Sequence, residues 1–309
     1  MQRIGHRNQR TLGAAVTVHG VGFVTGVPVR LRFCPADAGT GLVFVRTDLA
    51  DRPETPASPG HVTGTARRTT LGHVDSGVTL VEHALAALAG LRIDNCRIEL
   101  DASEPPGLDG SAAGFVNALT DAGVELQSAR RPIYAADEPV LVTAGGATVG
   151  LHPPDGRGDT RLTASYVLDY GPRAFIPRQN TTTTVSPETF ARELAPCRTF
   201  LLESEVAALR KQGVGRHLTP ADLLVFGKRG PIQNAVRFAD EPARHKVLDL
   251  IGDLALCGFD LAGHLVAYRS GHALNVALAG ELVARAEGTL SAPNLHPAAV
   301  PTAAWRRVA

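Results

Sequence analysis

Several residue types and features are scarce in this sequence, and each scarcity argues against a class of protein. Only four of the 309 residues are cysteines and none forms a C-x-x-C pair, which suits reduced thiols in a reducing compartment. Aromatic residues make up only 5%, so alanine, valine and leucine carry the packing. The net charge is +1 with both signs mixed, which argues against nucleic acid as a partner.

Long apolar runs are also missing. No stretch reaches the length of about 18 apolar residues that a membrane-spanning helix needs. The first ten residues, MQRIGHRNQR, lack the apolar core of a signal peptide. We therefore expect a soluble, cytoplasmic monomer without stable membrane insertion, whose 44% hydrophobic residues suffice for substantial cores.

The chain length predicts two domains, and an internal similarity supports this division. HALAALAGLRIDNCRIEL followed by DGSAAGFVNAL reads as helix, strand, loop and helix, and DLIGDLALCGFDLAGHLVAY followed by RSGHALNVAL repeats that order. We interpret the similarity as a duplication that gives two α+β domains, residues 1–130 and 131–288, with a shared site between them. The Ala-, Pro- and Ser-rich composition of residues 289–309 predicts a mobile tail.

The hydrophobic periodicity predicts the main elements of both halves. In the first half we expect helices over residues 80–89 and 111–122, a loop over residues 48–60, and strands over residues 12–19, 27–33, 42–46 and 96–100. In the second half, strand patterns restart at Ile133, a long helix spans about residues 243–257, and a last helix begins near Gly271.

The segment RHKVLDLIGD carries the strongest chemical signal. His245, Asp249 and Asp253 stand at i, i+4 and i+8 of the expected helix, so their side chains share one face. An imidazole and a carboxylate are ligands that zinc accepts. The alternative for an isolated H-x-x-x-D is a histidine near a helix N-terminus with solvated carboxylates.

A second acid–histidine pair, Glu82-His83, lies on the helix expected over residues 80–89, which is apolar on most sides. Burying such groups is costly without partners, and a metal is one partner; a salt-bridged helix start is the alternative. If His83 joins His245 and Asp249, three protein ligands leave one position open, as in catalytic zinc sites. Glu82 would then be free to take a proton from a water molecule.

His272 follows Ser270-Gly271 at the start of the last helix. The positive potential of a helix N-terminus disfavours protonation of an imidazole unless a carboxylate offsets it, and Asp253 could provide that offset. A charged His272 could stabilise an oxyanion or protonate a leaving amine, whereas a histidine that only caps the helix is the alternative. Lys246 and Arg269 are candidate phosphate ligands, with solvated surface charge as the simpler explanation.

Six segments, spread over about residues 10–285, resemble one family in sequence and in order: VEHALAALAG, IDNCRIEL, DGSAAGF, RTF, RHKVLDLIGDLALCG and AYRSGHALN. They resemble UDP-3-O-acyl-N-acetylglucosamine deacetylase, the zinc amidase of lipid A biosynthesis. The resemblance implies that His83, His245 and Asp249 hold zinc, with iron as an alternative in the cell. It also implies that Glu82 is the general base and that His272, oriented by Asp253, is the cationic partner.

The same resemblance implies the substrate contacts. Thr199 would contact the tetrahedral intermediate and Phe200 would lie against the sugar. Lys246 and Arg269 would bind the diphosphate, and Tyr170 takes the place of an aromatic that stacks on uracil. The implied substrate is a UDP-linked, O-acylated N-acetylglucosamine, whose acetyl group is hydrolysed to acetate.

The family fold has two α+β domains that face each other across the active site, with a βαβ insert in the second that forms an acyl tunnel. Residues 201–226 would be that insert here. Departures from the family pattern are Val24 in place of a histidine, the lack of a cysteine in ARRTTLG, and an insert that reads GVGRHLTPADLLVFGKRG. They bear on substrate range, so two alternatives stay open: a deacetylase of another N-acyl sugar nucleotide, and a non-catalytic sugar-nucleotide binding protein.

Overall fold

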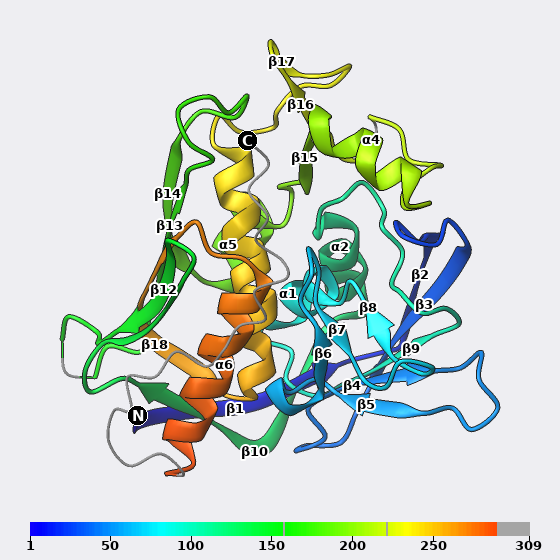
Figure 1. Cartoon of the computed structure of the whole chain (residues 1–309). Coiled ribbons are helices and arrows are strands. Elements are labelled where there is room, and N and C mark those ends of the chain that lie inside the picture. Colours follow the sequence, from blue (N-terminus) through cyan, green and yellow to red (C-terminus); the bar gives the residue numbers. More distant parts are fainter. Residues whose placement is uncertain (157, 221, 289–309) are drawn as a thin grey trace.

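A computed structural model of the chain describes residues 1–156, 158–220 and 222–288, and the tail predicted over residues 289–309 lies outside this range. Helices and strands are both abundant, so the predicted α+β class is confirmed. Figure 1 shows a layer of helices between two sheets, with the long helix α5 (Glu241–Leu254) near its centre. The other helices of this layer are α1 (Glu82–Gly90), α2 (Ala113–Ala122) and α6 (His272–Ala286).

The first sheet has five strands. In spatial order they are β2 (Val16–Val21), β3 (Pro28–Pro35), β9 (Cys96–Leu100), β4 (Leu42–Arg46) and β5 (Glu54–Pro56). Neighbours are antiparallel except β9 and β4, which are parallel. Buried and exposed residues alternate along β3 because only one face of the sheet packs on the helices. The prediction of a loop throughout residues 48–60 is wrong, since β5 lies within it.

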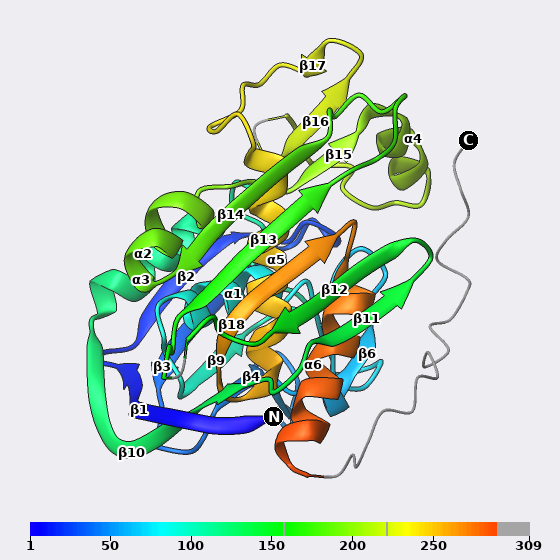
Figure 2. The ribbon, with the colours of Figure 1, turned by 90° about the vertical axis from the view of Figure 1, so that its left-hand side faces the viewer.

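Five strands of the second sheet repeat this arrangement, as Figure 2 shows face-on. They are β11 (Val140–Ala144), β12 (Ala147–His152), β18 (Asp260–Tyr268), β13 (Leu162–Leu168) and β14 (Gln179–Val185). Again one pair alone, β18 and β13, is parallel among these neighbours. In each set, a helix precedes the central strand and another follows it along the chain. The two sets therefore share strand order, strand direction and helix position, as a duplicated fold requires.

The other two strands of the second sheet, β1 (Gln2–Leu12) and β10 (Val124–Ala135), form a long antiparallel ribbon that pairs with β18 through β10. The predicted strand over residues 12–19 is confirmed only from Val16, in β2, because the chain turns between β1 and β2. The predicted restart at Ile133 is wrong because β10 is continuous. Pro132 does not interrupt β10: it lies opposite His6 of β1, and pairing with β18 begins only at the next residue, Ile133. The boundary between residues 130 and 131 thus falls inside a strand, and the division into two domains there remains a proposal.

A ring of four charges fastens the ribbon to both halves. Arg7 lies 2.6 Å from Asp94, just before β9, and 2.6 Å from Asp260, at the start of β18. Arg131 lies 3.3 Å from each of the same two carboxylates. The charges balance, and each carboxylate has two guanidinium partners.

Each half has an insert between its last edge strand and its central helix. In the first half it contains η1 (Pro59–His61) and a sheet of β6 (Val62–Gly64), β7 (Thr70–Leu71) and β8 (Val78–Thr79). In the second half it contains α3 (Pro187–Thr189), η2 (Phe190–Leu194), β15 (Phe200–Leu202), α4 (Glu203–Lys211), β16 (Leu224–Gly227) and β17 (Gly230–Pro231). β15 and β16 are parallel and flank α4, so the predicted βαβ insert is present. The short η3 (Ala255–Cys257) follows α5.

The helices α1 and α5 approach each other very closely at Gly252. A Cβ atom at Gly252 would lie 2.1 Å from the Glu82 carbonyl oxygen, so glycine is required for this contact. The contact brings the start of α1 against the last turn of α5. Within the described part of the chain, no helix has the length and apolarity needed to cross a membrane.

Candidate metal centre and acid–base pair

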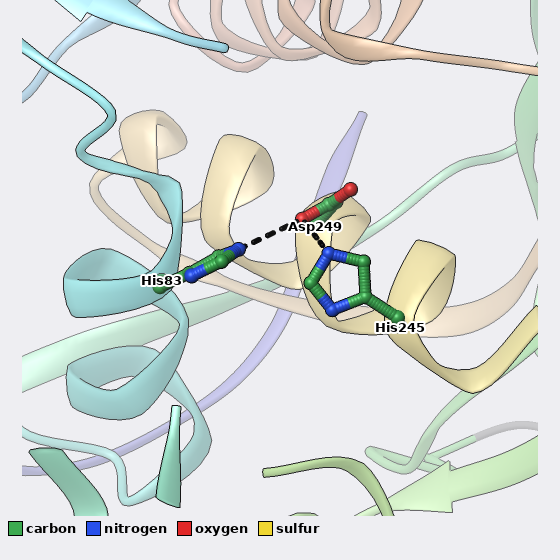
Figure 3. A group of neighbouring side chains, drawn as sticks. All are labelled: His83, His245 and Asp249. Atoms are coloured by element: carbon green, nitrogen blue, oxygen red, sulfur yellow. Dashed lines mark ion pairs between the residues drawn. The ribbon is translucent and has the colours of Figure 1, made fainter. Parts of the chain in front are cut away.

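Three predicted ligands from opposite halves of the chain meet where α1 packs on α5. Figure 3 shows His83 on α1 pointing toward Asp249 and His245 on α5. The His83 Nε2 atom is 3.6 Å from Asp249 Oδ1, and the His245 Nε2 atom is 3.3 Å from the same oxygen. One ligand atom from each residue lies within 4.8 Å of the other two, and all three side chains are buried. This group can hold a metal ion.

The ligand atoms of Asp249 and His245 have the free lone pairs and the charge states that binding of a divalent cation requires. Asp249 Oδ1 is buried and has no hydrogen-bond partner, which is costly unless a cation occupies the space in front of it. His245 Nδ1 donates to the Cys197 carbonyl oxygen at 3.0 Å, which leaves the lone pair of Nε2 free for a metal. Burial lowers the pKa of His245 to about 4, so its imidazole is neutral as a ligand must be. The residues present therefore fit a metal.

Lys246 holds the second oxygen of Asp249. Its ammonium donates to Asp249 Oδ2 at 2.7 Å from a largely buried position. Burial alone would raise the pKa of Asp249, but the adjacent His245 imidazole and the Lys246 ammonium outweigh burial and hold that pKa well below its usual range. The carboxylate is therefore ionised, with one oxygen engaged by Lys246 and the other directed at the two histidines.

Glu82 lies beside this group and is also buried. Its Oε2 atom accepts a hydrogen bond from the main-chain N–H of Thr69 at 3.0 Å, and its Oε1 atom is 3.9 Å from His272 Nε2. Burial raises the pKa of Glu82, although the nearby imidazoles of His272 and His83 oppose this shift. A carboxylate with a raised pKa is suited to accept a proton near neutral pH.

His272 stands at the first residue of α6 and is held by Asp253. Its Nδ1 atom is 2.9 Å from Asp253 Oδ2, and Asn275 Nδ2 donates to the same oxygen at 2.9 Å. Burial alone would lower the pKa of His272, but the charges of Asp253 and Glu82 raise it to about 9. The imidazole is thus cationic at neutral pH, and the predicted pairing of His272 with Asp253 is present.

The four predicted substrate contacts are only partly gathered around this centre. The ring of Phe200 lies 6.2 Å from that of His245 and 6.2 Å from that of Tyr170, so it contacts both. Arg269 is exposed at the end of β18, with its guanidinium 5.8 Å from the ring centre of Tyr268. Lys246 is engaged by Asp249, as above, so the roles of these residues toward a diphosphate or a uracil remain predictions.

Thr199 is placed by its main chain. Its N–H donates to the Gly110 carbonyl at 2.7 Å, and its carbonyl accepts from Leu224 at 3.0 Å, two residues beyond the Cys197 carbonyl that binds His245. The neighbouring Arg198 anchors this loop to the first turn of α5 through the buried Glu241, with Nε and Oε1 2.9 Å apart. The predicted role of Thr199 toward an intermediate is not tested by these contacts.

Sequence reasoning missed three groups at this site. Asn275 stands three residues after His272 on α6, so helical spacing could have revealed it. The Cys197 carbonyl and Thr69 had no such signal, because both reach the site through the folding of the two inserts. Thr69 is wholly buried, and it binds Glu82 and Asp253 at once.

Nearly the whole chain is similar to known proteins of one family. The family model of LpxC, UDP-3-O-acyl N-acetylglycosamine deacetylase, matches residues 9–284. A UDP-3-O-acyl-N-acetylglucosamine deacetylase of Trichormus variabilis is 40% identical over 280 residues, which cover 89% of this chain and 98% of the relative. Relatives of the same name from Anaeromyxobacter dehalogenans (39% over 298 residues, 94% of each chain) and Chlamydia caviae (38% over 278 residues, 90% of this chain and 97% of the relative) are also similar.

A buried group of two histidines and one carboxylate, beside a carboxylate–imidazole pair, is suited to metal-assisted hydrolysis. The similarities assign the class more closely. The chain belongs to the LpxC family of UDP-3-O-acyl-N-acetylglucosamine deacetylases.

Proposed function

We propose that the protein hydrolyses the N-acetyl group of UDP-3-O-acyl-N-acetylglucosamine, giving the free amine and acetate in lipid A biosynthesis. The observation that carries the proposal is the meeting of His83, His245 and Asp249 beside Glu82 and His272. Membership in the deacetylase family supports the same reaction. We also propose that the protein acts in the cytoplasm as a monomer, which is consistent with a UDP-linked substrate of this pathway.

We propose zinc as the metal, with iron as the alternative in the cell. Two imidazole nitrogens and one carboxylate oxygen suit zinc and leave a fourth position for water or substrate. A cation bound there would polarise the acetamide carbonyl and increase the acidity of water.

The proton transfers are assigned to Glu82 and His272. Glu82 takes a proton from the attacking water, because its Oε1 atom is not held by Thr69 and its raised pKa favours proton uptake. The charged His272, fixed by Asp253, stabilises the negative oxygen that develops on the acetamide and gives a proton to the departing amine. Thr199 adds a contact to that oxygen.

The substrate contacts follow the family resemblance. Phe200 would lie against the sugar and Tyr170 against the uracil, and the Phe200 ring contacts the rings of both Tyr170 and His245. Lys246 and Arg269 would face the diphosphate, and the βαβ unit from β15 to β16 would hold the acyl chain. The two alternatives, another N-acyl sugar nucleotide as substrate and a binding protein without catalysis, differ from this proposal in what they predict for acetate release.

The test combines metal analysis with an acetate-release assay on the UDP-sugar with and without its O-linked acyl chain. We expect one metal per chain and fast release only from the acylated substrate. Equal rates on both substrates would favour the first alternative, and bound metal without any release would favour the second. Glu82→Ala and His272→Ala should each lower turnover on the order of a hundredfold, the usual effect of removing an acid–base group. Near-normal turnover in both variants would refute the assigned roles.

A further inference from the structure

Thr69 stands at a junction between the two proton-transfer groups. It lies just before β7, in the insert of the first half, and its side chain is wholly buried. Its main-chain N–H donates to Glu82 Oε2 at 3.0 Å, and its hydroxyl donates to Asp253 Oδ1 at 2.6 Å. The same hydroxyl oxygen is 3.3 Å from His272 Nδ1. One residue thus touches the base, the imidazole and the carboxylate that orients the imidazole.

The hydrogen bond from Thr69 gives the two oxygens of Glu82 different roles. Oε2 is held by the main-chain N–H, so Oε1 is the oxygen directed at His272 Nε2, 3.9 Å away. A carboxylate held through one oxygen cannot rotate freely, and its other oxygen therefore keeps one direction. The position of that oxygen depends on where the main chain at Thr69 lies.

The bond to Asp253 fixes the main chain at Thr69 in turn. Asp253 is wholly buried and accepts from the Thr69 hydroxyl, from His272 Nδ1 and from Asn275 Nδ2. These donors engage both of its oxygens, so the carboxylate and the imidazole have one relative orientation. Hydrogen bonds to an ionised acceptor are stronger than neutral ones, so this hydroxyl is a firm anchor for the insert.

We infer that Thr69 is a positioning residue that sets Glu82 and His272 at a fixed separation, through its main-chain N–H on one side and its hydroxyl on the other. This inference rests on the proposed function of those two groups. Thr69 itself touches no reacting atom, so it acts only through its two neighbours. Loss of the hydroxyl releases the main chain that holds Glu82, and loosens the carboxylate that aims His272.

The chain provides a matched control in the next residue. The Thr70 hydroxyl also makes a hydrogen bond, at 2.7 Å to the Thr79 hydroxyl, but that pair lies within the small sheet of β7 and β8. Thr69→Val and Thr70→Val each replace a hydroxyl by a methyl group of similar size. Thr69→Ser keeps the hydroxyl and removes only a methyl group.

The experiment compares these three variants as purified, zinc-loaded protein in the acetate-release assay on acylated UDP-N-acetylglucosamine, with zinc content measured for each. Loss of such an outer partner typically costs about 10- to 100-fold in activity. We expect this loss in kcat for Thr69→Val, with KM and zinc content unchanged. Thr69→Ser should recover most of kcat, and Thr70→Val should match the unmodified protein.

A second measurement does not depend on turnover. In protein labelled with ¹⁵N-histidine, the Nδ1-bound proton of His272, assigned by its absence in His272→Gln, should shift in Thr69→Val and stay in place in Thr70→Val. If Glu82→Ala is inactive while Thr69→Val keeps a normal kcat, the inference about Thr69 is wrong and the proposed function stands. If the unmodified protein releases no acetate, the proposed function fails. In that case the resonance still tests the inference, because an unshifted His272 proton in Thr69→Val would show that Thr69 does not position His272.

Discussion

The close crossing of α1 and α5 predicts a large effect for a small substitution, Gly252→Ala. The added Cβ would lie 2.1 Å from the Glu82 carbonyl oxygen, whereas an ordinary contact needs at least 3.4 Å. The helices must therefore separate locally by about 1.3 Å, since the obstacle is main chain and cannot rotate away. Glu82 and His83 then move relative to His245 and Asp249.

The size of the effect differs between stability and function. Overpacking typically costs about 1–3 kcal/mol, and replacing glycine by alanine inside a helix returns about 1 kcal/mol. The net change in the free energy of unfolding is therefore small, at about 0–2 kcal/mol. A misplacement of about 1 Å at a catalytic group can lower the rate on the order of a hundredfold. We expect kcat/KM to fall by about that factor and zinc to bind more weakly.

Gly280→Ala on α6 is the matched control. Its Cβ would meet nothing closer than Pro59 Cβ at 3.9 Å, so it should keep normal activity and gain up to about 1 kcal/mol from helix propensity. The assays are urea unfolding of the metal-free protein, zinc competition against a chelator, and acetate release. Normal zinc affinity and turnover in Gly252→Ala would refute the claim that this crossing sets the geometry of the site.

Three further predictions concern pH, a buried ion pair and the metal. The pKa of His272 is raised to about 9, so the charged imidazole is present below that pH. Activity should therefore fall as the pH rises through about 9, or through a lower pH when a metal cation is bound nearby. A pH–rate profile without this alkaline decrease would contradict the role of His272. On the acid side, activity should fall as Glu82, whose pKa is raised, takes up a proton. Arg198→Met leaves the wholly buried Glu241 without its cation, so the free energy of unfolding from urea denaturation should fall by about 3–5 kcal/mol; Arg161→Met, which breaks the exposed pair with Asp159, is the control and should leave it unchanged. Free zinc at a hundred times its dissociation constant should stabilise the metal-free protein by about 2.7 kcal/mol, and an unchanged urea midpoint would mean that the folded protein does not bind it.

Much of the site could be predicted because its groups lie on helices. His245, Asp249 and Asp253 are four residues apart, so the sequence places them on one face before any tertiary contact is known. Glu82-His83 stood out because charge on an apolar helix requires a partner. The contact of His83 with Asp249 depends on the helix crossing at Gly252, and no sequence pattern predicts that crossing. The duplication and the family resemblance were therefore needed to predict that these two residues meet.

The errors have a common physical origin. The ribbon of β1 and β10 was missed because its residues are mostly polar and partly exposed, so apolar alternation is weak along both strands. Its stability comes instead from mutual pairing and from the charged ring around Arg7. Thr69 was missed for a similar reason, since the short strands of its insert are positioned by tertiary contacts and not by their own sequence.

The helices α1 and α5 occupy equivalent places in the two repeats, and this affects which residues each repeat can supply to the site. Two identical subunits related by a twofold axis would present the same residues from both central helices, so every group at the axis would occur in duplicate. A single polypeptide has no such restriction. Here α1 supplies Glu82 and His83, whereas α5 supplies His245, Asp249 and Asp253. One repeat can therefore provide the proton acceptor, Glu82, while the other provides the carboxylate that orients the charged His272.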